Sequence, residues 1–163
     1  MKKRIKRIVG FCLASTLLLG MSIPTYAETI PPELGKVVEG STLIEDNVSE
    51  VTLYNPARGN ILNRGVARVS DNNDGTVNAY GSVIGAVICD RMDLTLVLQR
   101  YDGTYWNDVA TKSYSASNIG VLSRSFNTTV SRGYYYRVKA ACVATDGRTV
   151  ESQMPVTDGV WVD

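Results

Sequence analysis

The sequence predicts an all-β protein, built as a single antiparallel β-sandwich of about seven strands. Residues 134–142 alternate at a strict period of two, with an apolar or aromatic side chain at every second position. That period is typical of a strand with one buried face, as found in antiparallel sheets. Residues 91–101 repeat the pattern, and turn sequences recur at the short intervals expected of a sandwich or barrel. No convincing helical period interrupts them, so two packed antiparallel sheets are the simplest solution.

Residues that favour turns bound the expected strands. Asp71-Asn72-Asn73-Asp74-Gly75 separates the first two strands, Asp102-Gly103 closes a hairpin, and Asp146-Gly147 precedes the last strand. These sequences turn the chain because Gly tolerates positive φ, while Asp and Asn hydrogen-bond to nearby backbone groups. The expected strands are 66–70, 76–84, 91–101, 105–112, 122–130, 134–142, and a last one running from 148 toward 161.

In the tyrosine-rich strand, the alternation assigns each side chain to one face. The face expected to be buried holds Tyr134, Tyr136, Val138, Ala140 and Cys142. The opposite face, expected to be solvated, holds Tyr135, Arg137 and Lys139.

The first 27 residues have the parts of an export signal. An apolar stretch from residue 8 to about residue 23 follows five bases, Lys2, Lys3, Arg4, Lys6 and Arg7. Thr25-Tyr26-Ala27 places small residues where signal peptidase reads them, so we expect cleavage after Ala27 and a secreted, extracellular protein. An uncleaved anchor is the alternative, but the apolar stretch is short for a span of about 20 residues. A lipoprotein at Cys12 fits less well, because Phe11 occupies the position where a small residue is needed.

The charge balance of the exported part is acidic. Of the 17 Lys plus Arg, five lie in the signal, which leaves 12 against 16 Asp plus Glu and a net charge of −4. This distribution argues against binding to nucleic acid, and against binding to a membrane after signal cleavage. Residues 28–60 carry much of the acid, with Pro31-Pro32 and no sustained period, so they are expected to form an acidic flexible leader. The alternative is a first strand around residues 51–54, packed on the domain that residues 61–163 form.

Two cysteines, Cys89 and Cys142, remain after removal of the signal. An even pair in an exported chain favours a disulfide, so we expect a bond between them. The alternative is a pair of buried thiols in a host that lacks oxidising machinery, since free Cys is itself a well-buried residue type.

The tyrosine-rich strand resembles the penultimate strand of fibronectin type III and immunoglobulin-like sandwiches. In those folds the first tyrosine, here Tyr134, forms a corner that ties the strand to the preceding loop. A longer pattern is carried by Asn63-Arg64-Gly65, Val69-Ser70, Gly75-Thr76-Val77, Gly81, Leu98-Gln99-Arg100-Tyr101, Gly103, Trp106 and residues 133–138. Over residues 61–163 it is similar to a family of small secreted proteins of Gram-positive anaerobic bacteria without assigned function. The resemblance implies an immunoglobulin-like sandwich and carries over no functional residue.

The residue types argue against catalysis. The sequence has no histidine, which excludes Ser-His and Cys-His nucleophile pairs and His-ligated metals. The carboxylate pairs Asp90 with Asp93 and Asp102 with Asp108 are interpreted as turn and solvent-face acids. Residues 71–75 lack the ligand spacing and closing Glu of a calcium loop, so a hairpin turn is expected there. We therefore expect no catalytic residue, no metal and no cofactor.

Aromatic residues are the feature with binding potential. Tyr101, Tyr105 and Trp106 cluster at the Asp102-Gly103 turn, and the alternation places Tyr135 on the outer face, so these residues could form an exposed platform for a ligand. The alternative is that Trp106 folds inward and plugs the core. The sequence thus favours a secreted, noncatalytic protein-interaction or surface-associated module whose partner is a protein or glycan at the cell exterior. A carbohydrate-binding protein that uses the platform is the second hypothesis.

Overall fold

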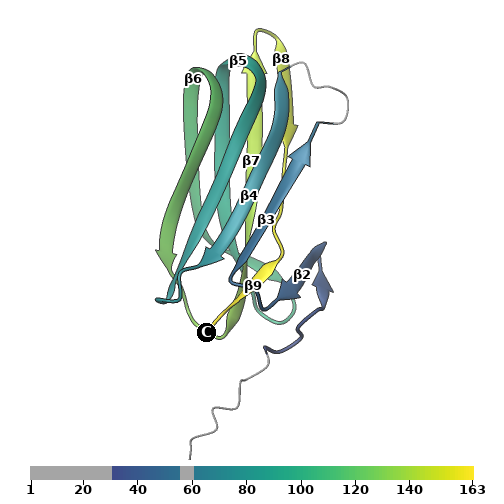
Figure 1. Ribbon diagram of the computed structural model, residues 1–163, viewed down its shortest axis with the longest axis vertical. Coiled ribbons are helices and arrows are strands. Elements are labelled where there is room, and N and C mark those ends of the chain that lie inside the picture. The colour runs from purple at the N-terminus through teal and green to yellow at the C-terminus, as the bar shows by residue number, and fades with distance from the viewer. Residues whose placement is uncertain (1–30, 56–60) are drawn as a thin grey trace, which may run out of the picture.

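The computed structural model describes residues 31–55 and 61–163 (Figure 1). These residues are all-β and form no helix, which confirms the all-β part of the predicted fold class. No helix long and apolar enough to cross a membrane occurs among them. The expected export signal and its cleavage site lie outside the described residues. The strands are β1 (Val37–Val38), β2 (Ser41–Ile44), β3 (Val48–Tyr54), β4 (Leu62–Asp71), β5 (Thr76–Tyr101), β6 (Trp106–Thr129), β7 (Tyr134–Asp146), β8 (Thr149–Gln153) and β9 (Gly159–Val162).

All described strands belong to one curled sheet, rather than to the antiparallel sandwich of about seven strands expected from the sequence. The strand order is β1-β2-β9-β7-β5-β4-β3, with β6 paired to β5 and β8 paired to β7. Most neighbours are antiparallel, but β2 and β9 are parallel, so the sheet is mixed. Because this one sheet curls, two parts of it face each other as layers, and the core lies between them.

The curl arises because β5 and β6 each bend and run through both layers. Up to Gly85, β5 pairs with β4, and from Arg91 onward it pairs with β7. β6 follows β5 through the bend, where the register shifts between Ile84 and Cys89. Figure 1 shows the two strands arching together at the top of the molecule. The sequence interpretation divided each of them into two separate strands, since the bend interrupts the alternation.

Gly85 lies at this bend because the backbone comes too close there for a side chain. A Cβ on Gly85 would lie 2.5 Å from the carbonyl oxygen of Val87 and 3.2 Å from that of Ile61. Carbonyl oxygens of the main chain cannot rotate away as a side-chain tip can, so glycine is needed here.

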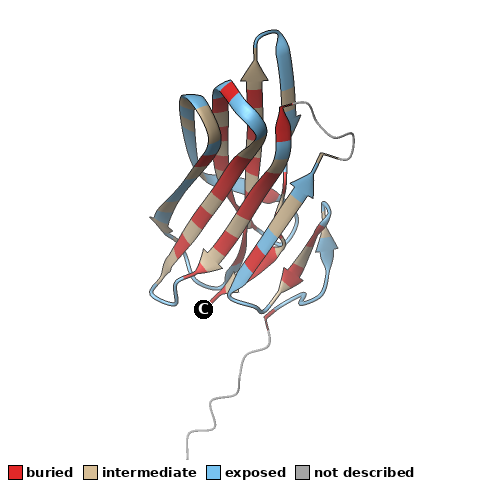
Figure 2. Cartoon of the chain, turned by 45° about the horizontal axis from the view of Figure 1, so that its top comes forward, coloured by how far each residue is buried: buried red, intermediate tan, exposed pale blue. Residues whose placement is uncertain are grey.

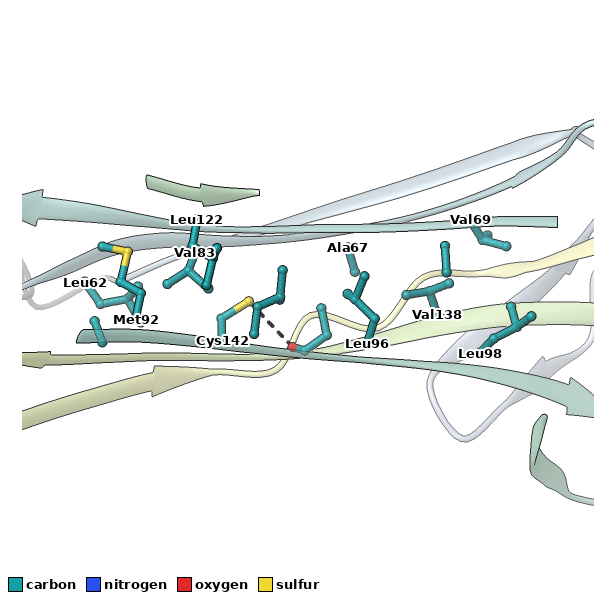
Figure 3. Packing of buried hydrophobic residues seen from close by; sticks show 14 of the residues in the cluster. Leu62, Ala67, Val69, Val83, Met92, Leu96, Leu98, Leu122, Val138 and Cys142 are labelled. Atoms are coloured by element: carbon teal, nitrogen blue, oxygen red, sulfur yellow. Dashed lines mark hydrogen bonds between the residues drawn. The ribbon is translucent and has the colours of Figure 1, made fainter. Parts of the chain in front are cut away.

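The main core lies between the two curled layers. Figure 2 shows buried residues alternating with less buried ones along β4 and β5, as the period of two predicts. Figure 3 shows side chains of both layers meeting in the space between them, among them Val69, Val83, Met92 and Leu96, all of which are fully buried. Burial of this apolar surface is the main stabilising contribution.

The expectation of a flexible leader at 28–60 is wrong for residues 37–54, which form β1, β2 and β3. β3 pairs with β4 along its whole length, from Val48 opposite Ser70 to Tyr54 opposite Arg64. The alternative of a strand near residues 51–54 is therefore confirmed and extends further than expected. β3 is an edge strand that buries few side chains, so it shows no clear hydrophobic period. Its one acidic residue, Glu50, lies 3.8 Å from Arg68 of β4.

Candidate functional site

The outer face of β7 is covered, although the sequence interpretation placed it in solvent. Tyr135 and Arg137 are each only 3% exposed. Four buried side chains form a second core there, which we call the outer cluster: Leu43, Tyr101, Trp106 and Tyr135, with Val38 and Trp161 packed against them. β1 and β2 supply Val38 and Leu43, so the segment expected to be a leader is what removes this face from water.

Arg137 is the polar centre of this covered face. Its Nε donates to Gln99 at 2.8 Å, Nη1 donates to Ser41 Oγ at 3.0 Å, and Nη2 donates to the Glu39 carboxylate at 2.9 Å. The guanidinium also lies 4.3 Å from the centre of the Trp106 ring. Burial lowers the pKa of Arg137, while its hydrogen bond to the Glu39 carboxylate opposes that shift. The buried cation is thus tied to β1–β2, β5 and β6 at once.

The expected aromatic platform does not form one exposed face. Trp106 and Tyr101 are buried, whereas Tyr105 is 65% exposed. The Trp106 and Tyr101 rings pack against each other at 5.4 Å, and the Trp106 indole donates to the carbonyl of Val38 at 3.3 Å. A Cβ on Gly159 would lie 2.7 Å from the Trp106 ring, so the indole fills its space closely. Trp106 is a core residue, as the alternative interpretation expected.

A pocket of about 300 Å³ opens beside the outer cluster. Three chain turns and the last strand converge on it: the segment before β1, the β5–β6 turn, the β6–β7 turn and β9. The pocket is lined by Pro32, Glu33, Tyr101, Asp102, Gly103, Gly133, Tyr134, Tyr135 and Trp161. Ligand pockets in proteins typically measure roughly 300 to 1,000 Å³ and are mostly apolar and aromatic. This pocket is therefore the candidate functional site.

The lining carboxylates are already engaged by the protein itself. Asp102 accepts hydrogen bonds from the backbone nitrogens of Thr104 and Tyr105, each at 2.8 Å, and these bonds lower its pKa. Glu33 pairs with Lys36 at 2.7 Å, and this hydrogen bond lowers the pKa of Glu33. Both carboxylates are therefore ionised at neutral pH, and both help to shape the pocket wall.

The hydroxyl and indole groups of the lining differ in whether they have a hydrogen-bond partner within the protein. Tyr101 donates its hydroxyl to the carbonyl of Gly103 at 2.7 Å and accepts from Lys36 at 2.9 Å. The Trp161 indole donates to the carboxylate of Asp163. The Tyr135 hydroxyl, in contrast, is buried and has no hydrogen-bond partner in the described structure. Burial raises the pKa of Tyr135, and the negative charges of Glu33 and Glu45 raise it further.

The three consecutive tyrosines of β7 have different roles. Tyr136 is buried as predicted, but Tyr134, expected inside, is 38% exposed, with the Arg100 guanidinium 4.6 Å from its ring centre. The tie to the preceding loop is made by Tyr136, whose hydroxyl donates to the carbonyl of Ser131 at 2.7 Å. The corner thus lies two residues later than the resemblance implied. Tyr134 and Tyr135 are instead available to line the pocket, where Tyr135 meets Trp161 edge to face at 4.9 Å.

The expected disulfide is absent from the structure, in which Cys89 and Cys142 are both free and buried. Cys142 pairs with Leu94 of β5, and Cys89 lies five residues before Leu94. At about 3.3 Å per residue, that offset separates the cysteines by about 16 Å along the strand, far beyond the reach of a disulfide. Cys142 donates to the carbonyl of Ser82, and burial raises the pKa of its thiol to about 12. The structure therefore agrees with the alternative interpretation, in which both cysteines are buried free thiols.

Several acids considered for catalysis or calcium accept hydrogen bonds from the protein's own backbone. Asp71 accepts from the backbone nitrogen of Asn73, and Asp74 accepts from that of Thr76, both at 2.9 Å. Asp90 accepts from the backbone of Gly147 at 2.8 Å. Within 31–55 and 61–163, no three His, Cys, Asp or Glu residues group as metal ligands would.

No family model matches the chain, and no curated protein matches it. Of the pocket residues, the sequence interpretation considered Tyr101 and Tyr135 for ligand binding. It missed Tyr134 and Trp161, and Trp161 comes to lie beside Tyr135 only when β7 pairs with β9. The available signal was the run of tyrosines at 134–136, in which both faces of the strand carry aromatic rings.

Proposed function

We propose that the protein is a secreted, noncatalytic interaction module of the cell exterior, and that its aromatic pocket takes up the ligand group. The observation that carries the proposal is the convergence of four aromatic residues, Tyr101, Tyr134, Tyr135 and Trp161, on one pocket of about 300 Å³. Aromatic side chains dominate binding sites because they bring large apolar surfaces with few rotatable bonds.

The chemistry of the lining supports binding rather than turnover. A general acid or base works best when its pKa lies near the operating pH. The two lining carboxylates, Glu33 and Asp102, have their pKa values lowered by hydrogen bonds, which moves them away from neutrality. The sequence also supplies no histidine for that role. The pocket therefore lacks a group suited to proton transfer near neutral pH.

A carbohydrate is the less favoured ligand. A sugar that leaves water needs partners for its hydroxyl groups, because an unpaired polar group costs about 1–3 kcal/mol on burial. Most polar side chains of this pocket already bond within the protein, and Trp106, proposed as the stacking ring, is buried. These features favour a partner that presents an apolar group.

The two tryptophans of the sequence provide a direct test. In a ¹H–¹⁵N correlation spectrum of the purified protein, Trp161 reports on the pocket and Trp106 reports on the buried outer cluster. We would titrate monosaccharides, aromatic peptides and proline peptides at millimolar concentration. We expect one class to shift the Trp161 indole signal saturably, and Tyr134→Ala to weaken that shift. The control Tyr105→Ala removes an exposed ring outside the pocket and should change nothing. If no class moves the Trp161 signal, the pocket is not a binding site.

A further inference from the structure

We infer that the aromatic pocket receives a proline-bearing, extended segment of a partner protein, with a basic residue beside the proline. This inference rests on the proposed function and names the ligand of that same site. Three independent features of the pocket lead to it: a proline already present in its wall, the state of its hydrogen-bonding groups, and its charge.

A proline of the chain itself, Pro32, forms part of the wall of this aromatic pocket. Pro32 lines the pocket together with Tyr101, Tyr134, Tyr135 and Trp161. Aromatic-lined grooves are a recurrent docking surface for proline-rich segments in the polyproline II conformation. Such segments are extended before they bind, so docking them orders little additional chain. A volume of about 300 Å³ is small for a ligand pocket and suits a short piece of chain.

The hydrogen-bonding groups of the pocket point to the same ligand. Asp102, Glu33, Tyr101 and Trp161 all bond within the protein, so the lining offers a ligand few free partners. Proline needs few hydrogen-bond partners, because it has no backbone N–H to leave unpaired on burial. A proline can therefore enter this pocket without the desolvation cost that a sugar or a polar side chain would carry.

The charge of the lining predicts a basic neighbour for the proline. Glu33 and Asp102 line the pocket, and no Lys or Arg is among the lining residues. Lys36 offsets Glu33 from outside the lining, but Glu33 and Glu45 still act together on Tyr135, where their charges add to burial in raising its pKa. A positive side chain beside the proline would complement this acidic rim, whereas a negative one would be repelled.

The test uses three short acetylated and amidated peptides that share one extended sequence. The first carries prolines flanked by lysines, the second has alanine in place of each proline, and the third has glutamate in place of each lysine. Each is titrated into the purified protein, and binding is followed by the Trp161 indole signal. We expect the proline–lysine peptide to bind about tenfold or more tighter than the alanine peptide, and about threefold or more tighter than the glutamate peptide.

Variants assign the binding to the pocket. Trp161→Ala and, separately, Tyr134→Ala should each weaken the proline–lysine peptide by about tenfold, while Tyr105→Ala should leave its affinity unchanged. Because Trp161→Ala removes the indole signal, the affinities of the variants and of the parent protein are compared by isothermal titration calorimetry. Because Trp106 lies in the buried outer cluster, an unchanged Trp106 indole signal shows that a variant is still folded. Glu33→Gln should reduce the preference for lysine over glutamate, and the control Glu50→Gln on β3 should not.

The outcomes separate this inference from the proposed function. Equal binding of the proline and alanine peptides would overturn the inference, as would a Trp161 shift produced by sugars alone. In both of those cases the pocket would still be a binding site. A Trp161 signal that no peptide and no sugar moves would overturn both proposals together.

Discussion

The guanidinium of Arg137 on β7 and the carboxylate of Glu39, 98 residues earlier in the chain, form an ion pair of 2.9 Å that holds β1–β2 over the outer face of the sheet. Arg137 is almost completely buried, whereas the Glu39 side chain is 58% exposed. The pair therefore lies at the boundary between the outer cluster and solvent. It connects the early segment of the chain to the strand that carries the pocket tyrosines.

Loss of the Glu39 carboxylate should destabilise the protein measurably. Glu39→Ala leaves the buried cation of Arg137 without its charged partner, and we expect a loss of about 1 kcal/mol, discounted for the exposure of Glu39. The matched control is Glu50→Ala, which removes a carboxylate 3.8 Å from a half-exposed Arg68 and should cost less than about 0.5 kcal/mol. Urea denaturation midpoints compare the two. Equal midpoints would show that β1–β2 is not held by Arg137.

The neighbouring tyrosines of β7 form a second matched pair. Tyr136→Phe removes the hydrogen bond to Ser131 and should cost about 1 kcal/mol. Tyr135→Phe removes a buried hydroxyl that has no partner in the described structure, so stability should stay the same or rise slightly. The free energies of unfolding, measured by denaturant titration, test this difference. A larger loss for Tyr135→Phe would mean that its hydroxyl has a partner, such as an ordered water.

Substitution of Gly159 tests how closely Trp106 is packed, and substitution of Gly120 is its control. A Cβ at Gly159 would lie 2.7 Å from the Trp106 ring, so Gly159→Ala should cost about 1–3 kcal/mol through overpacking. The nearest atom to a Cβ at Gly120 is 3.8 Å away, so Gly120→Ala should be nearly neutral. Thermal melting compares the two variants. A Gly159→Ala variant as stable as the parent would place the Trp106 ring elsewhere.

The cysteines should behave as buried thiols. Peptide mapping without reductant should recover Cys89 and Cys142 unlinked, and iodoacetamide should label Cys142 only after unfolding, since its pKa near 12 leaves little thiolate. A peptide that joins the two cysteines would contradict this description.

The raised pKa of Cys142 also sets a pH dependence with a definite sign. Above about pH 9 the thiol ionises in the unfolded chain but stays protonated in the folded protein up to about pH 12. The unfolded state therefore binds fewer protons in this range, and stability should fall as the pH rises through it. Cys142→Ala should lower stability overall but reduce that alkaline decline. If the variant and the parent decline equally, ionisation of Cys142 is not the cause.

The sequence predicted the parts of the fold that depend on neighbouring residues. The alternation at 134–142 identified β7 and its inner face from Tyr136 to Cys142, because each strand residue points to a face set by its own position. The turns at Asp74-Gly75, Asp102-Gly103 and Asp146-Gly147 were also placed correctly, since their chemistry is local.

The missed features depend on residues far apart in the chain. Arg137 is a charged residue on a strand face, so solvent was the natural expectation for it. Its burial requires Glu39, Ser41 and Gln99, which are 98, 96 and 38 residues away. The same long-range contacts explain why β1–β2 looked like a leader, and why Tyr135 was expected in solvent while Trp161 was not recognised as a pocket residue. The expectation that the outer face of β7 lies in solvent was wrong, and this error accounts both for the leader and for the pocket residues.

Hydrogen exchange of residues 31–44 tests most directly the claim that this segment is part of the folded domain and forms a wall of the pocket. In the structure, the backbone nitrogen of Leu43 donates to Lys36 at 2.9 Å, that of Gly35 donates to Leu43 at 2.8 Å, and that of Thr42 donates to the Asp158 side chain at 2.7 Å. We expect these three amides to exchange slowly, and Glu39→Ala to speed their exchange. Exchange of all three at the rate of an unstructured peptide would contradict the account, because Arg137 and the pocket would then lack their cover.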